Sequence, residues 1–384
     1  MKNSDPRLHD LSEFTPQHIT FRNEIREFAL KELTDDSYEI DKNETFPREK
    51  IRMMARRGWL GIPFPKEYGG LGLDTTSYII AVEEVGRVCA STGITFCAHI
   101  SLGCYPIYSS GNEDQKSRYL PPLLRGEKLG SFGLTEPNAG SDAAATETTA
   151  RLEGDRYIIN GTKRFITSGS TAGTLVITAT EDKSLGVHGI SAFIIDSDTE
   201  GFKPVKDEEK LGLKGSVTSE LIFVDCAVPK TNLLGKPKQG FKIFMETLDG
   251  GRISIGALAL GIAQGALDFL VDYVEHHKLK KRQWVQKTIA DIATEIFAAR
   301  HLVYHAARLK DQGKPVTLSG AMAKLFASEV SMRATRKAIQ ITGCEGLVKK
   351  FPLERFLRDT KLNEIGEGTS EIQRIVISRQ ILGR

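Results

Sequence analysis

The chain has 384 residues, of which 40% are hydrophobic and 26% are charged, as expected of a folded globular protein with two or three domains. Its 52 Lys and Arg nearly balance its 49 Asp and Glu, and a net charge of +3 gives no reason to expect a nucleic acid or a membrane as partner. Thirty-six glycines without a repeat period exclude a collagen-like or low-complexity chain.

The cysteines and the N-terminal residues bear on the compartment. The five cysteines form no Cys-x-x-Cys pair, which argues against a disulfide framework or zinc site and predicts a reducing, cytoplasmic location. The first residues, MKNSDPRLHDLSEF, are polar with early acids, so we expect neither a secretory signal nor a transit peptide. The longest uncharged stretch, 88–112, contains Ser, Thr, His, Pro and Gly and is expected to be a buried segment rather than a membrane span.

Residues 1–129 are predicted to form an N-terminal helical domain. Thr15-Pro16 is a typical cap and first helical position, and Pro47 opens a second helix. A third helix is expected to start at a Thr75-Thr76 cap, with Glu83-Glu84 facing solvent. The side chains expected to face inward in the three helices are Phe21, Ile25, Phe28 and Ala29, then Ile51 and Met54, then Ile79, Val82 and Val85.

Residues 130–235 change to a strand pattern. Short runs rich in Val, Ile and Thr are separated by Gly154-Asp155 and by Asn160-Gly161, and an Asn-Gly pair is a strong hairpin signal. The strands are too close together in sequence for crossover helices, so we expect a middle domain that is an antiparallel β barrel or sandwich.

Residues 236–384 are helical again. Segments such as GALALGIAQGALDFL are apolar on more than one face, which indicates burial between helices or a subunit interface. The fold class is therefore α+β multidomain, with a helical domain, a β domain and a C-terminal helical bundle in that order.

Several weaker patterns favour ordinary structure over chemistry. The His301/His305 pair has no acid between them, so no metal site is expected. The Gly70–Asp74 segment has two of the glycines of a dinucleotide-binding turn but no third, and is expected to be a loop. The basic run 278–282 fits an exposed turn or, less well, a phosphate contact.

Four separated stretches together resemble the acyl-CoA dehydrogenase family. They are LTEPNAGSD (134–142), RFITSG (164–169), LDGGRI (248–253) and IGEGTSEIQR (365–374). The resemblance extends over nearly the whole chain and has the same α–β–α order. It implies FAD as cofactor, an acyl-CoA substrate, an electron-transferring flavoprotein as acceptor, and a homo-oligomer that is a dimer or a tetramer.

The resemblance also implies which residues hold the ligands. The loop 132–141 would line the flavin, with the Thr135 hydroxyl near the ring and Ser141 near the pantetheine. Phe165 stands where relatives usually carry Trp, and it can still shield a ring face. The full set expected to bind FAD is Phe132, Leu134, Thr135, Ser141, Phe165, Ile166, Thr167, Gln283, Gln340, Gly343, Cys344, Thr369 and Glu371, and the set expected at the substrate is Ser141, Asp249, Arg252 and Gly368.

The resemblance also makes Glu367 the expected catalytic base. It lies between Gly366 and Gly368, so no neighbouring side chain blocks a close approach to its backbone. Removal of a proton α to a thioester needs a positioned carboxylate, and burial should raise its pKa. Some relatives place the base on the helix with LDGGR, but the matching residue here, Gly251, has no side chain that could act.

The sequence departs from the family at three places. The loop around 276–282 lacks the usual Arg-x-x-Phe-Gly and is shorter, and Lys280, Lys281 and Arg282 are candidates to replace its charge at the FAD pyrophosphate. Cys344 replaces a Gly, which would crowd the FAD adenosine. Gly366 replaces a Tyr common in relatives, which predicts tolerance of a branched or bulky short acyl group.

The leading hypothesis is an FAD-dependent acyl-CoA dehydrogenase that forms a trans-2-enoyl-CoA and passes electrons to an electron-transferring flavoprotein. The alternatives are an enoyl-CoA reductase, which runs the same site in reverse, and a non-catalytic acyl-CoA-binding relative. The altered FAD loop keeps the last alternative open, and Glu367 counts against it because a binding protein needs no base.

Overall fold

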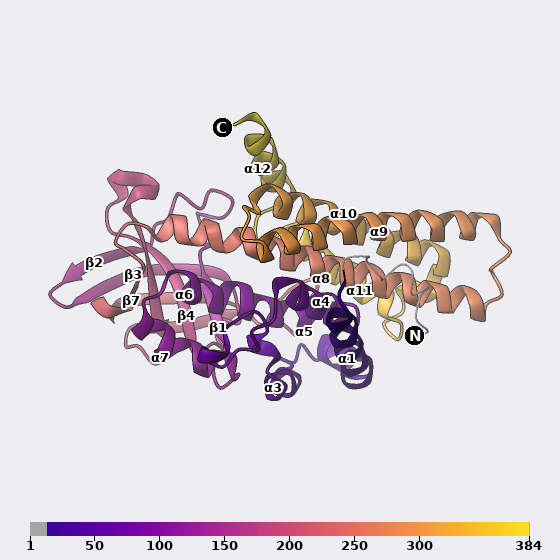
Figure 1. The fold of residues 1–384 in the computed structure, drawn as a ribbon, viewed down its shortest axis with the longest axis horizontal. Coiled ribbons are helices and arrows are strands. Elements are labelled where there is room, and N and C mark those ends of the chain that lie inside the picture. The colour runs from indigo at the N-terminus through magenta and orange to yellow at the C-terminus, as the bar shows by residue number, and fades with distance from the viewer. Residues whose placement is uncertain (1–13, 384) are drawn as a thin grey trace.

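The computed structural model describes residues 14–383, and thus almost all of the polar N-terminal stretch lies outside the described residues. Helices, a β-sheet and a longer helical bundle follow one another along the chain (Figure 1). The three-part α–β–α architecture expected from the sequence is confirmed. The boundaries at 129/130 and 235/236 stay predictions, and they fall in the connections after α7 and before α8.

The N-terminal part is a cluster of helices with one π-helical segment, η4 (His99–Cys104). The helices are α1 (Pro16–Leu33), α2 (Asp36–Lys42), α3 (Arg48–Arg56), α4 (Thr75–Gly86), α5 (Ala90–Ala98), α6 (Tyr105–Ser110) and α7 (Glu113–Leu124). Thr15 caps α1 as expected, since its hydroxyl accepts from His18 N at 3.2 Å. All nine side chains expected to face inward are buried. Residues 88–104 of the uncharged stretch, which include α5 and η4, are buried as well, whereas residues 105–112 are partly exposed.

Two expectations for α4 are wrong. Its N-cap is Asp74, which accepts from Ser77 N at 2.8 Å, because the carboxylate one residue earlier is better placed than either Thr. Glu83 and Glu84 are buried rather than exposed. Their charges are neutralised by arginines from other helices, which a helical period cannot show.

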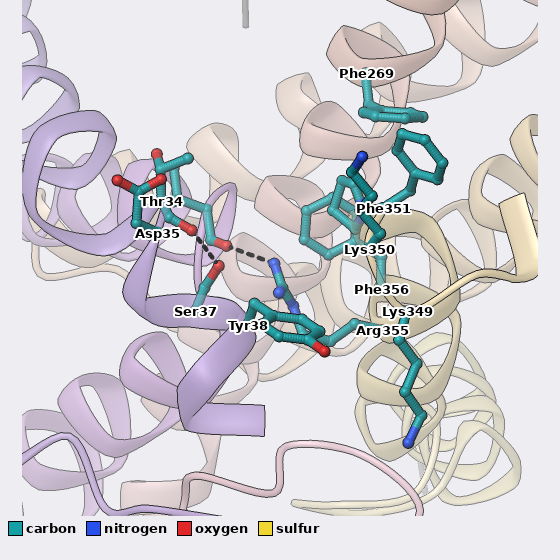
Figure 2. Close-up of a pocket in the computed structure, with 12 residues that line it drawn as sticks. Thr34, Asp35, Ser37, Tyr38, Phe269, Lys349, Lys350, Phe351, Arg355 and Phe356 are labelled. Carbon is teal, nitrogen blue, oxygen red and sulfur yellow. Dashed lines mark hydrogen bonds between the residues drawn. The ribbon is translucent and has the colours of Figure 1, made fainter. Parts of the chain in front are cut away.

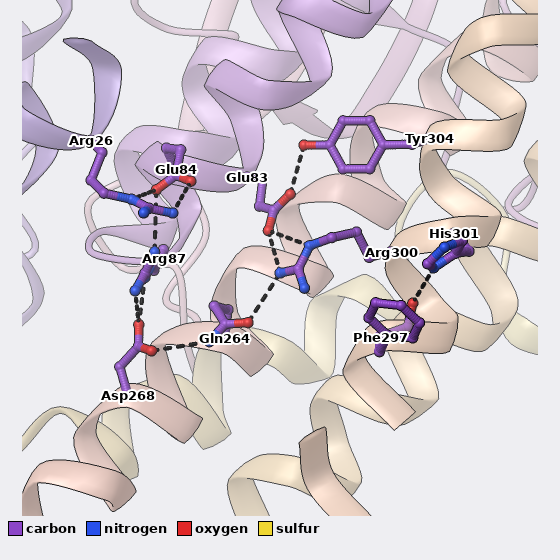
Figure 3. Close-up of polar contacts among 10 residues, drawn as sticks. All are labelled: Arg26, Glu83, Glu84, Arg87, Gln264, Asp268, Phe297, Arg300, His301 and Tyr304. Atoms are coloured by element: carbon purple, nitrogen blue, oxygen red, sulfur yellow. Dashed lines mark hydrogen bonds and ion pairs between the residues drawn. The ribbon is translucent and has the colours of Figure 1, made fainter. Parts of the chain in front are cut away.

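Those acids belong to a buried ionic network that joins the two helical parts (Figure 3). Glu83 pairs with Arg300 at 2.6 Å and accepts from the Tyr304 hydroxyl at 2.6 Å. Glu84 pairs with Arg26 at 2.6 Å. The remaining members of the network are Arg87, Gln264 and Asp268. Buried charges need such partners, so the network fixes the N-terminal helices against the bundle.

The middle part is one eight-stranded sheet in the order β6-β7-β3-β2-β4-β5-β8, with β1 beside β4. The strands are β1 (Gly130–Gly133), β2 (Thr149–Glu153), β3 (Arg156–Thr167), β4 (Thr174–Thr180), β5 (Ile190–Asp196), β6 (Phe202–Asp207), β7 (Thr218–Pro229) and β8 (Leu233–Leu234). Most neighbours are antiparallel, as expected. The pairs β1·β4 and β2·β4 are parallel, which differs from the antiparallel expectation. The connections within these pairs run through other strands and loops and contain no helix, so a parallel pair does not need a crossover helix here.

The hairpin prediction at Asn160-Gly161 is wrong. β3 continues through both residues, and the turn of the β2–β3 hairpin is Gly154-Asp155. The Asn160 side chain instead holds β7, since its Oδ1 accepts from Asp225 N at 2.8 Å where the register of the two strands shifts. The Asn-Gly pair therefore marks a β-bulge rather than a turn.

The C-terminal part is a bundle of α8 (Gly240–His276), α9 (Gln283–Asp311), α10 (Thr317–Thr342), α11 (Pro352–Asn363) and α12 (Ser370–Leu382). α8 contains the apolar segment noted in the sequence. It is long and apolar enough to cross a membrane, but 94% of that window is buried inside the protein, as expected of a core helix. α12 stands away from the rest of the bundle (Figure 1).

Candidate active site

Glu367 lies in the tight turn between α11 and α12. Its φ is +55°, and that of Gly368 is +93°, so two successive residues are in the left-handed region. A non-glycine residue there costs roughly 1–2 kcal/mol and needs support from its surroundings. Part of the support comes from Gln373, whose side-chain amide donates to the carbonyls of Glu367 at 3.3 Å and of Gly368 at 2.9 Å.

The Glu367 carboxylate points at the backbone of α8. A Cβ added to Gly251 would overlap Oε2 of Glu367 and would also lie 3.3 Å from Leu102 Cδ2 of η4. Oε2 is buried and has no hydrogen-bond partner within residues 14–383. An unpaired buried carboxylate oxygen is costly, and such groups gather at functional sites.

The charges around Glu367 come from α8 and α10. Arg252, which is buried, donates to Asp249 at 2.6 Å, and Asp249 also accepts from the Thr317 hydroxyl at 2.5 Å. Burial raises the pKa of Glu367 to about 7, although the positive charges of Lys324 and Arg252 oppose this shift. A carboxylate with that pKa is a stronger base than an exposed one and is still substantially ionised at neutral pH.

A buried polar cluster lies next to the carboxylate. The Tyr78 hydroxyl donates to Cys97 O at 2.9 Å, and Ser101 donates to the same carbonyl at 2.7 Å. Ser254 donates to Gly251 O at 2.8 Å. Burial raises the pKa of Tyr78 and of Cys97, so both stay neutral near pH 7. Ser254 Oγ also lies within hydrogen-bond distance of Ser101 Oγ, at 3.4 Å, so η4 packs against α8, the helix that faces Glu367.

Phe165 projects from a β-bulge. The register of β3 against β7 shifts between Lys163 and Ile166, and Phe165 has a φ of +58°. Its ring is 57% exposed, with the Arg164 guanidinium 4.9 Å from the ring centre. Ile166 is instead buried in the sheet core, so only its backbone can reach a ligand, and Thr167 beside it is half-buried. The bulge thus presents an aromatic face at the edge of the sheet.

The loop after β1 is tied to the same strand. Lys163 and Glu136 form a buried ion pair at 2.7 Å, and Glu136 also accepts from Glu147 N at 2.6 Å. Arg164 N donates to Thr135 O at 2.8 Å. Thr135 and Leu134 are half-buried, whereas Ser141 is exposed. The ion pair therefore holds the expected flavin loop beside the bulge that carries Phe165.

Two other expected residues have structural contacts. The Phe132 ring stacks on Phe244 of α8, with 4.0 Å between the ring centres. Thr369 is the N-cap of α12 and accepts from Ile372 N at 3.3 Å, while Glu371 in the first turn is exposed. Roles for these residues at a cofactor stay predictions.

The remaining residues expected at the cofactor lie elsewhere. Gln283 begins α9, and Gln340, Gly343 and Cys344 are at the end of α10; all four are exposed. Tyr273 of α8 donates to Thr342 O at 3.4 Å, which keeps the α8–α9 turn close to the end of α10. This end of the bundle is opposite the sheet that carries Phe165 (Figure 1). One copy of the chain therefore does not bring the two groups together.

A cavity of about 530 Å³ lies between the α1–α2 junction, α8 and α11 (Figure 2). Its walls include Tyr38, Phe269, Phe351 and Arg355, and none of the expected site residues lines it. Within the described residues, no group of three or more His, Cys, Asp or Glu side chains could hold a metal ion.

The chain matches three protein-family descriptions in succession. They are "Acyl-CoA dehydrogenase, N-terminal domain" over residues 15–127, the middle domain over 131–226 and the C-terminal domain over 238–382. The chain belongs to the acyl-CoA dehydrogenase family. It is thus an oxidoreductase that acts on a CH–CH group, and the family expected from the four motifs is confirmed.

Three named proteins are similar to this chain over more than nine-tenths of its length. "Acyl-CoA dehydrogenase, short-chain specific" from Clostridium acetobutylicum is 50% identical over 96% of this chain and 98% of its own. "Acryloyl-CoA reductase (NADH)" from Anaerotignum propionicum is 48% identical over 94% of this chain and 93% of its own. "Short-chain specific acyl-CoA dehydrogenase, mitochondrial" from Rattus norvegicus is 45% identical over 98% of this chain and 93% of its own.

Three solved structures superpose on this chain over nearly its whole length. Butyryl-CoA dehydrogenase from Megasphaera elsdenii superposes with a TM-score of 0.95 at 43% identity, over 97% of this chain and 100% of its own. A chain solved in work on the electron transferring flavoprotein of Acidaminococcus fermentans gives 0.96 at 50% identity, over 98% and 100%. An acyl-CoA dehydrogenase complexed with FAD from Bacillus anthracis gives 0.90 at 32% identity, over 97% and 68%.

The cofactor is FAD, and the residues present fit it. The exposed Phe165 ring offers a flat apolar face, and the half-buried Thr135 and Thr167 hydroxyls beside it can hydrogen-bond to a polar ring edge. The buried ion pair of Glu136 with Lys163 links the loop that carries Thr135 to the strand that carries Phe165 and Thr167.

Sequence reasoning missed Lys324. This residue is buried in α10, hydrogen-bonds to the Gly368 carbonyl and belongs to no local motif. Leu102, which lies against the Gly251 backbone, is part of the uncharged stretch that was expected to be buried. Lys324 is a charged residue in a run of Ala, Leu and Phe, and an unpaired charge within an apolar helix segment was the one signal that could have indicated it.

Proposed function

We propose that the chain catalyses the α,β-dehydrogenation of a short acyl-CoA thioester to a trans-2-enoyl-CoA, with Glu367 as the base. The observation that carries the proposal is the buried, unpartnered Oε2 of Glu367, which faces a helix backbone cleared of side chains at Gly251. Such an oxygen has free lone pairs that can accept a proton taken from a substrate carbon. The expected pKa shift agrees, because burial raises the pKa of Glu367 to about 7.

In the proposed reaction the Cα–H bond breaks and its proton passes to Glu367. The Cβ–H bond would also break, its hydride would pass to FAD when FAD is bound, and the Cα–Cβ double bond would form. Arg252 is a candidate to orient the thioester or its CoA part, because its Nε is buried without a partner within the described residues. Gly368, Asp249 and Ser141 are the other candidates for substrate contacts. Placing a general base is worth about 10²–10⁴-fold in rate.

We also propose that a second copy of the chain completes the FAD site. Phe132, Leu134, Thr135, Ser141, Phe165, Ile166, Thr167, Thr369 and Glu371 would come from one copy, and Gln283, Gln340, Gly343 and Cys344 from the other. The separation of these two groups in one chain supports this arrangement (Figure 1). The protein would then be a dimer or a tetramer, and FAD loss should accompany dissociation in size-exclusion chromatography.

The basic run is our candidate for the charge at the FAD pyrophosphate. Residues 278–282 form an exposed turn between α8 and α9, and of the cations there Lys280 pairs with Glu275 at 3.0 Å. Changing Lys280, Lys281 and Arg282 to Ala should weaken FAD binding, measured by flavin fluorescence during dialysis. Unchanged FAD affinity would reject this role.

The direction of the reaction and the identity of its electron acceptor are a separate proposal. We favour dehydrogenation with an electron-transferring flavoprotein as acceptor, and a similar chain solved in work on such a flavoprotein supports it. The 48% identical acryloyl-CoA reductase keeps reduction of an enoyl-CoA as the second candidate. Assays of both directions with purified flavoprotein and with NADH would separate them. We place the protein in the cytoplasm, consistent with its scattered free cysteines.

The proposed function is tested by an anaerobic screen of acyl-CoA thioesters from C4 to C8 with the flavin absorbance as readout. We expect bleaching by at least one short thioester. A protein that stays colourless after incubation with FAD, or that binds FAD but is bleached by no thioester, would instead support a non-catalytic acyl-CoA-binding protein.

A further inference from the structure

The turn that carries Glu367 is held from two sides. Gln373 of α12 donates to the carbonyls of Glu367 and Gly368, as described above. From the opposite helix, the Lys324 ammonium also donates to the Gly368 carbonyl. Because Glu367 and Gly368 are both in the left-handed region, the direction of the carboxylate depends on these carbonyls staying in place.

Lys324 is an unusual lysine. Only 1% of its surface is exposed, yet no carboxylate lies within 4 Å of its ammonium in the described part of the chain. Its hydrogen-bond partner is a neutral carbonyl, and a buried ammonium without an ion pair is costly. Burial lowers the pKa of Lys324 to about 8, so the side chain still carries its proton at neutral pH. Among its charged neighbours, Glu367 has the largest influence.

The groups that face Glu367 come from four helices. Lys324 of α10 and Arg252 of α8 are positive, and each lowers the pKa of the Glu367 carboxyl. Tyr78 of α4 and Cys97 of α5 are neutral at pH 7, since burial raises the pKa of both. Arg252 already pairs with Asp249 at 2.6 Å, which offsets much of its charge. Among residues 14–383 Lys324 has no such partner, and it is therefore the main positive charge acting on the base.

We propose that Lys324 is a positioning residue for the catalytic base: it aims the Glu367 carboxylate through the Gly368 carbonyl, and its positive charge keeps that carboxylate ionised at neutral pH. The inference rests on the proposed function of Glu367. It assigns to one lysine both the geometry and the protonation state of the base. A merely structural lysine would supply the first of these and not the second.

The test compares three variants of the FAD-loaded protein. Lys324→Met removes the charge and the hydrogen bond, and Lys324→Arg keeps the charge but changes the geometry. Lys337→Met is the matched control, since Lys337 is on the same helix, roughly 20 Å away at 1.5 Å per residue, and pairs with Glu295 at 3.3 Å. The readouts are the pH profile of flavin bleaching by a saturating thioester, and infrared difference titration of the Glu367 carboxyl without substrate.

In Lys324→Met we expect the acidic limb of the pH profile to move upward, so that the ratio of rates at pH 6 and pH 9 falls roughly tenfold for a shift of one pH unit. The infrared titration of the carboxyl should shift by the same amount. Lys324→Arg and Lys337→Met should keep the wild-type limb, even if Lys324→Arg is slower at every pH.

An unmoved limb and an unmoved carboxyl titration in Lys324→Met would overturn the proposal. If Lys324→Met does not fold, a limb that moves upward in Lys324→Arg, which keeps the charge, would overturn it in the same way. These outcomes differ from failure of the proposed function, in which the wild-type flavin itself is not bleached by any thioester.

Discussion

Oε2 of Glu367 occupies the space that a side chain on Gly251 would need. The two residues are 116 positions apart in sequence, yet the carboxylate lies against the α8 backbone. It can do so because Gly251 has no Cβ there. Some relatives carry their base at the position of Gly251. Their carboxylate would thus lie in the same small volume that the Glu367 carboxylate fills here. A side chain at one position excludes the carboxylate from the other.

Gly251→Ala should therefore displace the carboxylate and slow flavin bleaching by roughly 10²-fold or more, the contribution of a placed general base. FAD content and thioester binding should be retained. In the double variant Gly251→Ala/Glu367→Asp the carboxylate is one methylene further back. The activation free energy of bleaching should therefore rise by less than the sum of the increases in Gly251→Ala and Glu367→Asp. Fully additive losses in a double-mutant cycle would contradict the overlap.

The stability of the protein should depend on pH through Glu367. Its pKa of about 7 in the folded state exceeds the ordinary value of 4.5, so the folded state binds more protons between these values. Stability therefore falls as pH rises through this window. Glu367→Gln removes the effect, and its advantage in urea unfolding should grow by roughly 2–3 kcal/mol from pH 4.5 to pH 8. The exposed Glu246→Gln is the control, and an equal trend in it would contradict the assignment.

The buried network of Figure 3 predicts a large effect of Arg300→Met. This change leaves the Glu83 carboxylate, which accepts from Arg300 at 2.6 Å and 3.2 Å, buried without its main counter-charge. Unfolding free energy should drop by roughly 3–5 kcal/mol, and Glu83→Gln/Arg300→Met should recover part of it. For comparison, Arg56→Met breaks an exposed pair with Glu49 and should cost less than about 1 kcal/mol. Equal effects of the two single changes would be inconsistent with a buried network.

Gly366 predicts the shape of the acyl group. No side chain fills this position, and an added Cβ would approach Leu362 Cδ2 at 3.2 Å. We expect the wild type to oxidise isobutyryl-CoA at least as well as butyryl-CoA, and Gly366→Tyr to lower that ratio of kcat/KM by roughly 10–100-fold through lost space. Gly366→Ala serves as the size control. Faster turnover of the straight-chain thioester by the wild type would reject the prediction.

In α4 the sequence predicted the buried apolar face and did not predict the burial of Glu83. The spacing of Ile79, Val82 and Val85 correctly predicted a buried helix face, because hydrophobic period is a local property. The burial of Glu83 was missed, since its partner Arg300 is 217 residues away. A single sequence cannot show such a pair.

The same contrast holds at the site. The IGEGTSEIQR motif indicated Glu367 as the candidate base through its resemblance to the family, and the carboxylate is buried as expected. Lys324 was not found, because it reaches the base from an ordinary stretch of helix, 43 residues earlier in sequence. The Asn160-Gly161 dipeptide led to a wrong hairpin prediction. β3 is hydrogen-bonded to β7 on both sides of it, and this strand pairing outweighs the local preference of the dipeptide for a turn.

The central claim is that Glu367 removes the α proton. The most direct measurement is stopped-flow bleaching of the flavin by butyryl-CoA under anaerobic conditions, in wild type and in Glu367→Gln loaded with equal FAD. We predict that the variant binds the thioester, as seen by a perturbed flavin spectrum, and bleaches at least 10²-fold more slowly than wild type. Bleaching of Glu367→Gln at the wild-type rate would show that another group takes the proton.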